Sequence, residues 1–137
     1  MDIRPYDDRD ELGVVNLWRN VFGYTEPRND PSRALRQKLS HDRDLLLVAV
    51  EDCHVIGTIM GGYDGHRGWL YSVAVDPAHR RRGIATALVQ HMERLLAERG
   101  CPKINLQVFP SNAQAVAFYR ALGFAVEERI SMGKVLS

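Results

Sequence analysis

The residues best suited to chemistry lie between Val73 and Ala85, in the sequence V-A-V-D-P-A-H-R-R-R-G-I-A. An apolar strand is expected to run into Asp76-Pro77, and a basic loop then leads to Gly83, which opens a long amphipathic helix. The N–H groups at a helix start have no partner within the helix, and the helix dipole adds partial positive charge there. Glycine lets the backbone approach a ligand closely. The stretch therefore predicts a phosphate or pyrophosphate site.

Three consecutive arginines, Arg80, Arg81 and Arg82, add full charges that can pair with phosphate oxygens. A basic run of this kind is also compatible with a solvated turn, or with a small nucleic-acid or nuclear-localisation patch. Its position between a strand end and a strongly periodic helix favours the phosphate site. Neither G-x-x-x-x-G-K-[ST] nor G-x-G-x-x-G occurs in the chain, so neither of these familiar phosphate motifs accounts for the site.

Two motifs together carry a resemblance to a known family. Arg80-x-x-Gly83-x-Ala85 resembles the acetyl-CoA signature Q/R-x-x-G-x-G/A of the GNAT family of N-acetyltransferases. The stretch S-N-x-x-A-x-x-F-Y-x-x-L-G-F, which ends at Phe124, resembles that family's second signature at the expected distance. The resemblance covers roughly Leu70 to Phe124 and is strongest to ribosomal-protein N-terminal acetyltransferases. The N-terminal half resembles the family only in the order of its elements.

The resemblance implies one acetyltransferase domain over residues 1–137, an α/β fold with helices on both faces of a mixed sheet, and acetyl-CoA as co-substrate without a metal. In the family, the pyrophosphate lies on the helix start, and the pantetheine arm lies against the preceding strand. The cofactor-binding residues implied are Val73, Ala74, Val75, Arg80, Arg81, Arg82, Gly83, Ile84, Ala85, Thr86 and Asn112. Core packing by Val73 and Val75, and helix capping by Asn112, are compatible with these roles.

Tyr119 matches the family's tyrosine that can protonate the thiolate leaving group, although packing beside Phe118 and Phe124 is the alternative. A tyrosine with a pKa near ~10 is a reasonable donor to a nascent thiolate. The amine must lose a proton before it attacks, and ribosomal-protein acetyltransferases carry a Glu in a Leu-Glu-Val strand. This chain has Leu106-Gln107-Val108 instead, so the base must be another residue or water.

The acceptor is expected to be a primary amine on a small molecule or a peptide. From residue types alone, Tyr24, Glu26, Asp64 and His66 are candidates to contact it. The candidate bases are Glu26, Asp30, Asp64, His66 and Tyr71. Each is also an ordinary loop or packing residue. No feature of the sequence distinguishes a protein N-terminus from a lysine, a polyamine, an amino acid or an antibiotic.

Composition limits the alternatives. Lys and Arg number 18 against 17 for Asp and Glu, and this near neutrality argues against a general nucleic-acid or membrane-surface role. Cys53 and Cys101 are too few for a disulfide framework, and no signal-like N-terminus is visible, so a cytoplasmic setting is expected. The five histidines are scattered without metal-ligand spacing.

Periodicity and turn residues predict the remaining elements. The expected strands are 2–6, 45–50, 55–63, 69–75 and 103–109; the three from 45 to 75 form an antiparallel meander, and the last is parallel to 69–75. The expected helices start near Asp7 and Asp30-Pro31, span 84–99, and run from Ser111 or Asn112 to Leu122.

The tail from Phe124 to Leu136 has strand-like composition, and the sequence leaves open whether it forms one strand or the two C-terminal strands usual in the family. It has no clear central turn, and one bent strand would leave a sheet edge free. Free edges invite pairing with another chain, so a homodimer is a further hypothesis. Two rivals to the enzyme remain open. One is a non-catalytic or regulatory CoA-binding module, favoured by Gln107; the other is a small nucleic-acid-binding domain.

Overall fold

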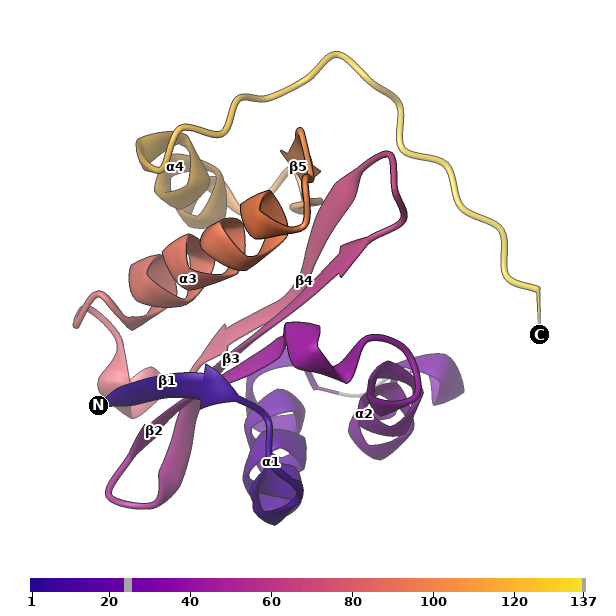
Figure 1. Ribbon diagram of the computed structural model, residues 1–137. Helices are drawn as coiled ribbons and strands as arrows, with labels where there is room; N and C mark the ends of the chain where they lie inside the picture. The colour runs from indigo at the N-terminus through magenta and orange to yellow at the C-terminus, as the bar shows by residue number, and fades with distance from the viewer. Residues whose placement is uncertain (24–25, 137) are drawn as a thin grey trace. The chain divides into compact units, whose positions relative to one another are not determined.

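The computed structural model describes residues 1–23 and 26–136, which belong to two compact units, Met1–Leu106 and Gln107–Ser137 (Figure 1). The first unit contains β1 (Asp2–Pro5), α1 (Glu11–Phe22), α2 (Pro31–Leu39), β2 (Leu46–Glu51), β3 (His54–Tyr63), β4 (Gly68–Val75), α3 (Ile84–Glu98) and β5 (Ile104–Asn105), with 3-10 turns η1 (Asp8–Asp10), η2 (Pro27–Asn29), η3 (Arg43–Leu45) and η4 (Pro77–His79). The second unit contains α4 (Ala113–Ala121).

The sheet has the order β1-β2-β3-β4-β5. Neighbouring strands from β1 to β4 are antiparallel, whereas β5 pairs parallel to β4 through Gly68↔Ile104 and Trp69↔Asn105. The predicted meander and the parallel last pair are therefore confirmed. A parallel pair needs a long crossover connection, and α3 supplies it.

Helix boundaries follow the capping residues expected from the sequence. The Asp30 side chain accepts a hydrogen bond from the Arg33 N–H, and Pro31 occupies the first turn of α2. Asp7 forms a capping box with Asp10 at the turn that leads into α1. Gly23 ends α1 with a φ of 71°, a conformation that glycine adopts without strain.

Helices cover both faces of the sheet, with α1 and α2 on one face and α3 on the other (Figure 1). The α1 face buries Val14, Leu17, Trp18, Leu35, Leu46, Val48 and Ala74. On the opposite face, α3 packs closely against β3 because two β3 positions are glycines. A Cβ added at Gly57 would lie 3.0 Å from Leu88 Cδ1, and one at Gly61 would lie 2.5 Å from Met92 Sδ. This packing fixes where α3 starts relative to the sheet.

Two sequence predictions are wrong in the C-terminal part. The expected strand 103–109 is reduced to Ile104–Asn105, because β4 provides ladder partners only at Gly68 and Trp69. None of residues 124–136, all of which the structure describes, belongs to a strand. Strand-like composition is not sufficient there, because a strand is stabilised by a paired neighbour and this segment has none.

Candidate active site

The loop that leaves β4 is held by hydrogen bonds around Asp76. Its N–H donates to the Ile56 carbonyl at 2.8 Å, and its side chain accepts from the Ala78 N–H at 2.9 Å. Pro77 starts the short turn η4, and the His79 N–H closes it on the Asp76 carbonyl at 2.8 Å. The chain therefore enters the basic loop along a fixed path.

The basic loop ends in a helix start without a side-chain cap. Gly83 is the N-cap residue of α3 with a φ of 74°, and no side chain bonds the first turn. The first intrahelical bond runs from the Ala87 N–H to the Gly83 carbonyl at 3.0 Å. The N–H groups of Ile84, Ala85 and Thr86 therefore have no partner within the helix, as an anion site requires.

Space is open in front of this helix start. A Cβ added at Gly83 would meet no atom within 4 Å. The preceding Arg81 also has a left-handed φ, 66°, which is uncommon for a residue with a side chain. The residues present thus fit a bound phosphate, because N–H groups without a partner in the helix adjoin open space at Gly83.

The three arginines do not behave alike. Arg82 forms a two-pronged salt bridge with Glu51 at the end of β2, with Nη1–Oε2 at 2.8 Å and Nη2–Oε1 at 2.6 Å. This pairing lowers the pKa of the Glu51 carboxyl to about 2. Arg80 and Arg81 are exposed and form no ion pair with any residue that the structure describes. Two cations of the loop are therefore available to a ligand, while the third fastens the loop to the sheet.

His79 lies between two carboxylates at the same place. Its Nε2 is 3.6 Å from Glu51 Oε2, and its Nδ1 is 3.8 Å from Asp76 Oδ2. Glu51 thus contacts both ends of the basic loop. This carboxylate joins the β2–β3 hairpin to the candidate anion site.

The second half of β4 presents the edge implied for the pantetheine arm. Val75 and Ala74 pair with Gly57 and Thr58 of β3, and Ala74 is buried while Val73 and Val75 are half-buried. β5 pairs only with the first half of β4. The two roles expected of this stretch, core packing and an edge for a ligand, are therefore compatible in the structure.

The second unit contains the two other predicted residues. Asn112 is the N-cap of α4, and its Oδ1 accepts from the Ala115 N–H at 3.1 Å, so the capping role is present. The Tyr119 ring lies edge-on to Phe118 and Phe124, with centroid distances of 4.9 Å and 5.7 Å. Burial raises the pKa of the Tyr119 phenol, so it remains a proton donor up to more alkaline pH than a free tyrosine.

Comparison with known sequences decides the family. The sequence model of the Acetyltransferase (GNAT) family matches residues 12–124. The chain belongs to the GNAT acetyltransferase family. It is 42% identical to Acetyltransferase ECA0875 of Pectobacterium atrosepticum over 136 residues, which is 99% of this chain and 96% of that protein. Family membership makes the chain an acetyltransferase, as its two motifs predicted.

Solved structures agree on the GNAT fold. The aminoglycoside N-acetyltransferase AAC(6')-Iy, solved with CoA, is 22% identical and matches with a TM-score of 0.80 over 98% of this chain and 93% of that one. A ribosomal-protein alanine N-acetyltransferase from Escherichia coli is 23% identical, with a TM-score of 0.75 over 89% and 76%. The fold prediction is confirmed. The ribosomal-protein enzymes are one group of structural neighbours among several.

The residues suggested for the acceptor have local partners. Asp64 Oδ1 accepts from the N–H groups of His66 and Arg67, each at 2.8 Å, and bonds to the Arg67 and His66 N–H groups lower the pKa of the Asp64 carboxyl. Glu26 is ion-paired with Arg28, and His66 is exposed. Tyr24 lies outside the described residues. Asp64 is thus a turn-stabilising carboxylate, and a lowered pKa makes it a weaker base.

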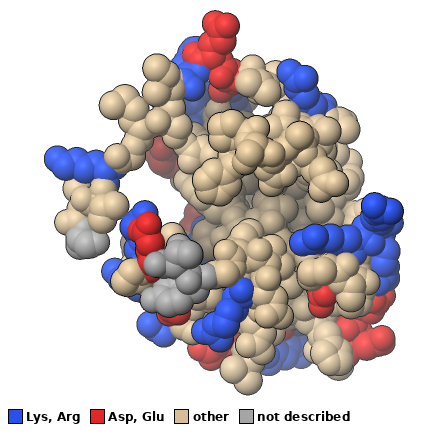
Figure 2. Space-filling model, turned by 180° about the vertical axis from the view of Figure 1, so that it is seen from behind, with Lys and Arg blue, Asp and Glu red and all other residues tan. Residues whose placement is uncertain are grey.

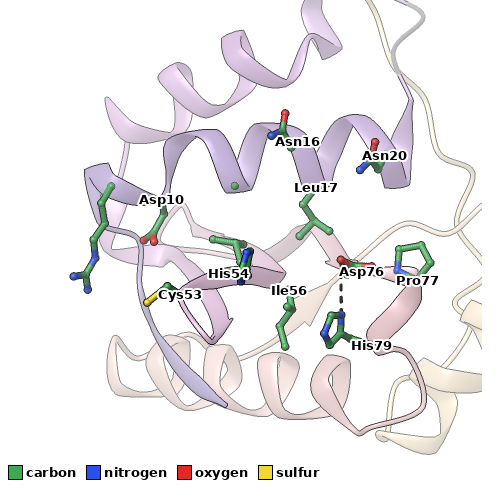
Figure 3. A pocket seen from close by; sticks show the side chains of 13 residues that line it. Asp10, Asn16, Leu17, Asn20, Cys53, His54, Ile56, Asp76, Pro77 and His79 are labelled. Carbon is green, nitrogen blue, oxygen red and sulfur yellow. Dashed lines mark ion pairs between the residues drawn. The ribbon is translucent and has the colours of Figure 1, made fainter.

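A cavity of about 440 Å³ lies on the α1 face of the sheet and reaches the start of the basic loop at Asp76, Pro77 and His79 (Figure 3). Asn16 and Asn20 of α1 lie along one side, and His54, Asp76 and His79 lie along the other. None of the residues predicted from the sequence lines it. This cavity is a weaker candidate for the functional site than the start of α3, because its carboxylate Asp76 already caps η4 and contacts His79.

Sequence reasoning missed the residues that support the site. Nothing local in the sequence marks Glu51, because its pairing with Arg82 joins positions 31 residues apart. Thr58 was assigned only to a strand, yet its buried hydroxyl bonds to Trp18 and to the Ser72 carbonyl. A threonine within a buried apolar strand was the one available signal, because a buried hydroxyl needs a partner.

Proposed function

We propose that the protein transfers an acetyl group from acetyl-CoA directly to a primary amine. The observation that carries this proposal is the uncapped start of α3, where open space at Gly83 adjoins the unpaired cations Arg80 and Arg81. Family membership supports it, and so does the CoA bound in the structure of AAC(6')-Iy. Acetyl-CoA supplies an acetyl group already activated as a thioester.

Binding of the co-substrate is divided between two stretches. The N–H groups of residues 81–86, together with Arg80 and Arg81, hold the pyrophosphate by charge-assisted hydrogen bonds. The β4 edge at Val73–Val75 holds the pantetheine arm through backbone groups. Arg82 contributes indirectly, because its guanidinium is engaged by Glu51. Asn112 has its side-chain oxygen on the Ala115 N–H, which leaves its NH₂ group for a ligand.

In the proposed reaction the amine nitrogen forms a bond to the acetyl carbon, the carbon–sulfur bond breaks, and Tyr119 gives its proton to the departing sulfur. The raised pKa of the Tyr119 phenol supports this role, because the group remains protonated at neutral pH. Gln107, whose Nε2 donates to Ser131 Oγ, has no carboxylate with which to accept the amine proton. We infer that water removes that proton, since Asp64 is committed to its turn.

The Tyr119→Phe variant tests the mechanism. Turnover should fall by ~10²-fold or more, while the Kd for acetyl-CoA stays the same, because the ring packing against Phe118 and Phe124 is kept. Release of CoA thiol with a panel of primary amines measures turnover, and calorimetry measures Kd. The alkaline loss of wild-type turnover should lie above pH 10, the ordinary tyrosine pKa, because burial raises the pKa of Tyr119. Unchanged turnover in the variant would remove Tyr119 from the mechanism.

The acceptor class we propose is a small-molecule or peptide primary amine. AAC(6')-Iy is named for aminoglycosides, and the Escherichia coli enzyme for a ribosomal-protein alanine, so neighbours with this fold are named for both kinds of amine. Glu26 and Asp64 would supply negative charge and His66 a polar contact; Tyr24 completes the set inferred from the sequence.

A non-catalytic CoA-binding module is the second candidate, and the neutral Gln107 in place of a carboxylate is the observation that favours it. The same thiol-release panel separates the two functions. Acetyl-CoA binding without CoA release from any amine would support the module. Tyr119 argues against this candidate, because the proposed proton donor is present and remains protonated at neutral pH.

Nucleic acid is not among the partners we propose. On the face shown in Figure 2, the side chains of Lys and Arg are interspersed with those of Asp and Glu.

Within the described parts of the chain, no helix is both long and apolar enough to cross a membrane. In the same parts, no group of three or more His, Cys, Asp or Glu residues is placed to hold a metal ion.

We further infer one domain over residues 1–137, since the family match spans parts of both compact units. The cytoplasm is the proposed location, supported by the free thiols of Cys53 and Cys101.

A homodimer is proposed because the tail exposes apolar side chains without strand pairing: Val126, Ile130, Met132, Val135 and Leu136. A monomer mass in light scattering at high protein concentration would contradict the dimer.

A further inference from the structure

One residue within β4 has a backbone conformation that strands do not use. Ser72 has a φ of 50°, in the left-handed region that disfavours residues with a Cβ. The β3–β4 register shifts between Thr58 and Met60, where Thr58 pairs with Ala74 but Met60 pairs with Tyr71. Ser72 and Val73 together therefore stand opposite the single residue Ile59, which is a β-bulge. Such strain persists only where the surroundings impose it.

A chain of two hydrogen bonds runs from the buried Trp18 indole to this bulge. Trp18 Nε1 donates to Thr58 Oγ1 at 2.8 Å, and Thr58 Oγ1 donates to the Ser72 carbonyl at 3.0 Å. The directions are unambiguous, because an indole nitrogen only donates, a carbonyl only accepts, and the hydroxyl does both. Thr58 is 0% exposed and Trp18 is 3% exposed, so water does not compete for these groups.

Packing alone does not require threonine at this position. Thr58 lies on the α1 face in a core of Val14, Trp18, Val48 and Ala74, where valine would have the same shape without a polar atom. A buried hydroxyl is costly unless it is bonded. The hydroxyl supplies a donor to the Ser72 carbonyl at the bulge, where the ladder is interrupted. The indole in turn fixes the rotamer of the hydroxyl.

The bulge separates two differently paired parts of β4. Before it, Gly68 and Trp69 pair with β5; after it, Ala74 and Val75 pair with β3 alone among the described strands. We propose that Thr58 and Trp18 are positioning residues that hold the Ser72 bulge and thereby the β4 edge to which the pantetheine arm of acetyl-CoA binds. This inference rests on the proposed function, because it assigns a role in binding the same co-substrate.

The test compares Thr58→Val with its conservative counterpart Thr58→Ser. Valine removes both hydrogen bonds and should weaken acetyl-CoA binding about tenfold, seen in Kd and KM, while kcat changes much less. Serine keeps the hydroxyl and should restore the Kd to within about twofold. Val48→Ala is the matched control: it removes buried volume directly opposite Thr58 but leaves the hydrogen bonds intact, so it should lower the melting temperature without changing Kd.

A second substitution tests the bulge itself. Glycine adopts a φ of 50° without strain, so adding Ser72→Gly to Thr58→Val should recover most of the lost affinity. The indole N–H resonance of Trp18, one of two tryptophans in the chain, should shift upfield in Thr58→Val because its hydrogen bond is lost. That shift is a readout independent of acetyl-CoA.

An unchanged Kd in folded Thr58→Val would overturn the proposal and leave the hydrogen bonds a purely stabilising role. Failure of Ser72→Gly to restore affinity would overturn the role of the bulge. If Thr58→Val does not fold, Thr58→Ala takes its place: it also removes both hydrogen bonds, and an unchanged Kd there would likewise overturn the proposal. Absence of acetyl-CoA binding by the wild type would instead reject the proposed function, so the two failures are distinguishable.

Discussion

The two halves of β4 have different surroundings although they form one strand. The first half, from Gly68, is paired with β3 on one side and β5 on the other. The second half, Val73–Val75, is paired with β3 through Ala74 and Val75 and then leads into the basic loop and α3. The bulge at Ser72 lies between them. One strand can thus be a packed scaffold at one end and a candidate binding edge at the other.

The difference shows how a small sheet keeps an edge for a ligand. An unpaired strand edge exposes backbone N–H and C=O groups, which is a liability unless something occupies it. In this protein the second half, which is paired on one side only, leads to the cationic loop of Arg80 and Arg81, whereas the first half is paired on both sides and contains the buried Leu70. Substitutions in the first half should therefore change stability, and substitutions around the second half should change affinity for acetyl-CoA.

The largest effect is expected in the paired half, from Gly68→Val. A Cβ there would lie 2.6 Å from Cys101 Sγ, so Cys101 or the strand must shift, at a cost of about 2–3 kcal/mol. The melting temperature should fall by roughly 4 °C for each kcal/mol, with an unchanged Kd for acetyl-CoA in the folded fraction. Gly62→Val on β3 is the control, because no atom lies within 4 Å of its added Cβ. Equal melting temperatures for the two variants would contradict the packing argument.

A smaller effect is expected beside the unpaired half. Arg80→Ala or Arg81→Ala should each weaken acetyl-CoA binding about tenfold, because each removes a charge-assisted contact to phosphate. Arg82→Ala should weaken it less, since the Arg82 guanidinium is already bound to Glu51. Calorimetry at two salt concentrations measures both the loss of affinity for acetyl-CoA and how far salt screens the contribution of each charge. Arg94→Ala, an exposed charge on α3 beyond the loop, is the control, and an equal loss there would indicate a general charge effect.

The smallest effect concerns the salt bridge that fastens the loop. The pKa of Glu51 is about 2 in the folded protein against an ordinary value of 4.5, so the folded state favours the charged form. Its stabilising contribution is therefore full above pH 4.5 and is lost as the pH falls toward 2. The melting-temperature difference between wild type and Glu51→Gln should be constant near neutral pH. It should shrink to zero as the pH falls from 4.5 toward 2. A difference independent of pH would exclude the salt bridge as its origin.

The sequence was sufficient for the parts of the molecule governed by local rules. Gly83 and the arginines before it indicate the phosphate site, because a helix start followed by apolar periodicity is a local pattern. Asp30-Pro31 and Gly23 likewise give the helix boundaries. The bulge at Ser72 and the Glu51–Arg82 pair were not predictable, since each depends on residues brought together by the sheet.

In the C-terminal tail, composition predicted a strand that the structure does not contain. Its apolar residues, Ile130 and Met132 among them, have strand-like composition, but residues 124–136 are not paired with any described strand. Strand propensity mostly reflects packing against neighbours, so composition alone cannot establish a strand. The same reasoning explains why the segment after Asn105 does not continue β5.

The most direct test of the central claim is acetyl-CoA binding by calorimetry, with wild type, Gly83→Ala and Gly83→Glu measured together. Both variants carry the strain of a φ of 74°, but only Glu places a long anionic side chain in the open space before α3. We expect the wild type to bind, Gly83→Ala to retain most of the affinity, and Gly83→Glu to lose it. No binding by the wild type, or equal binding by Gly83→Glu, would contradict the assignment of this helix start as the acetyl-CoA site.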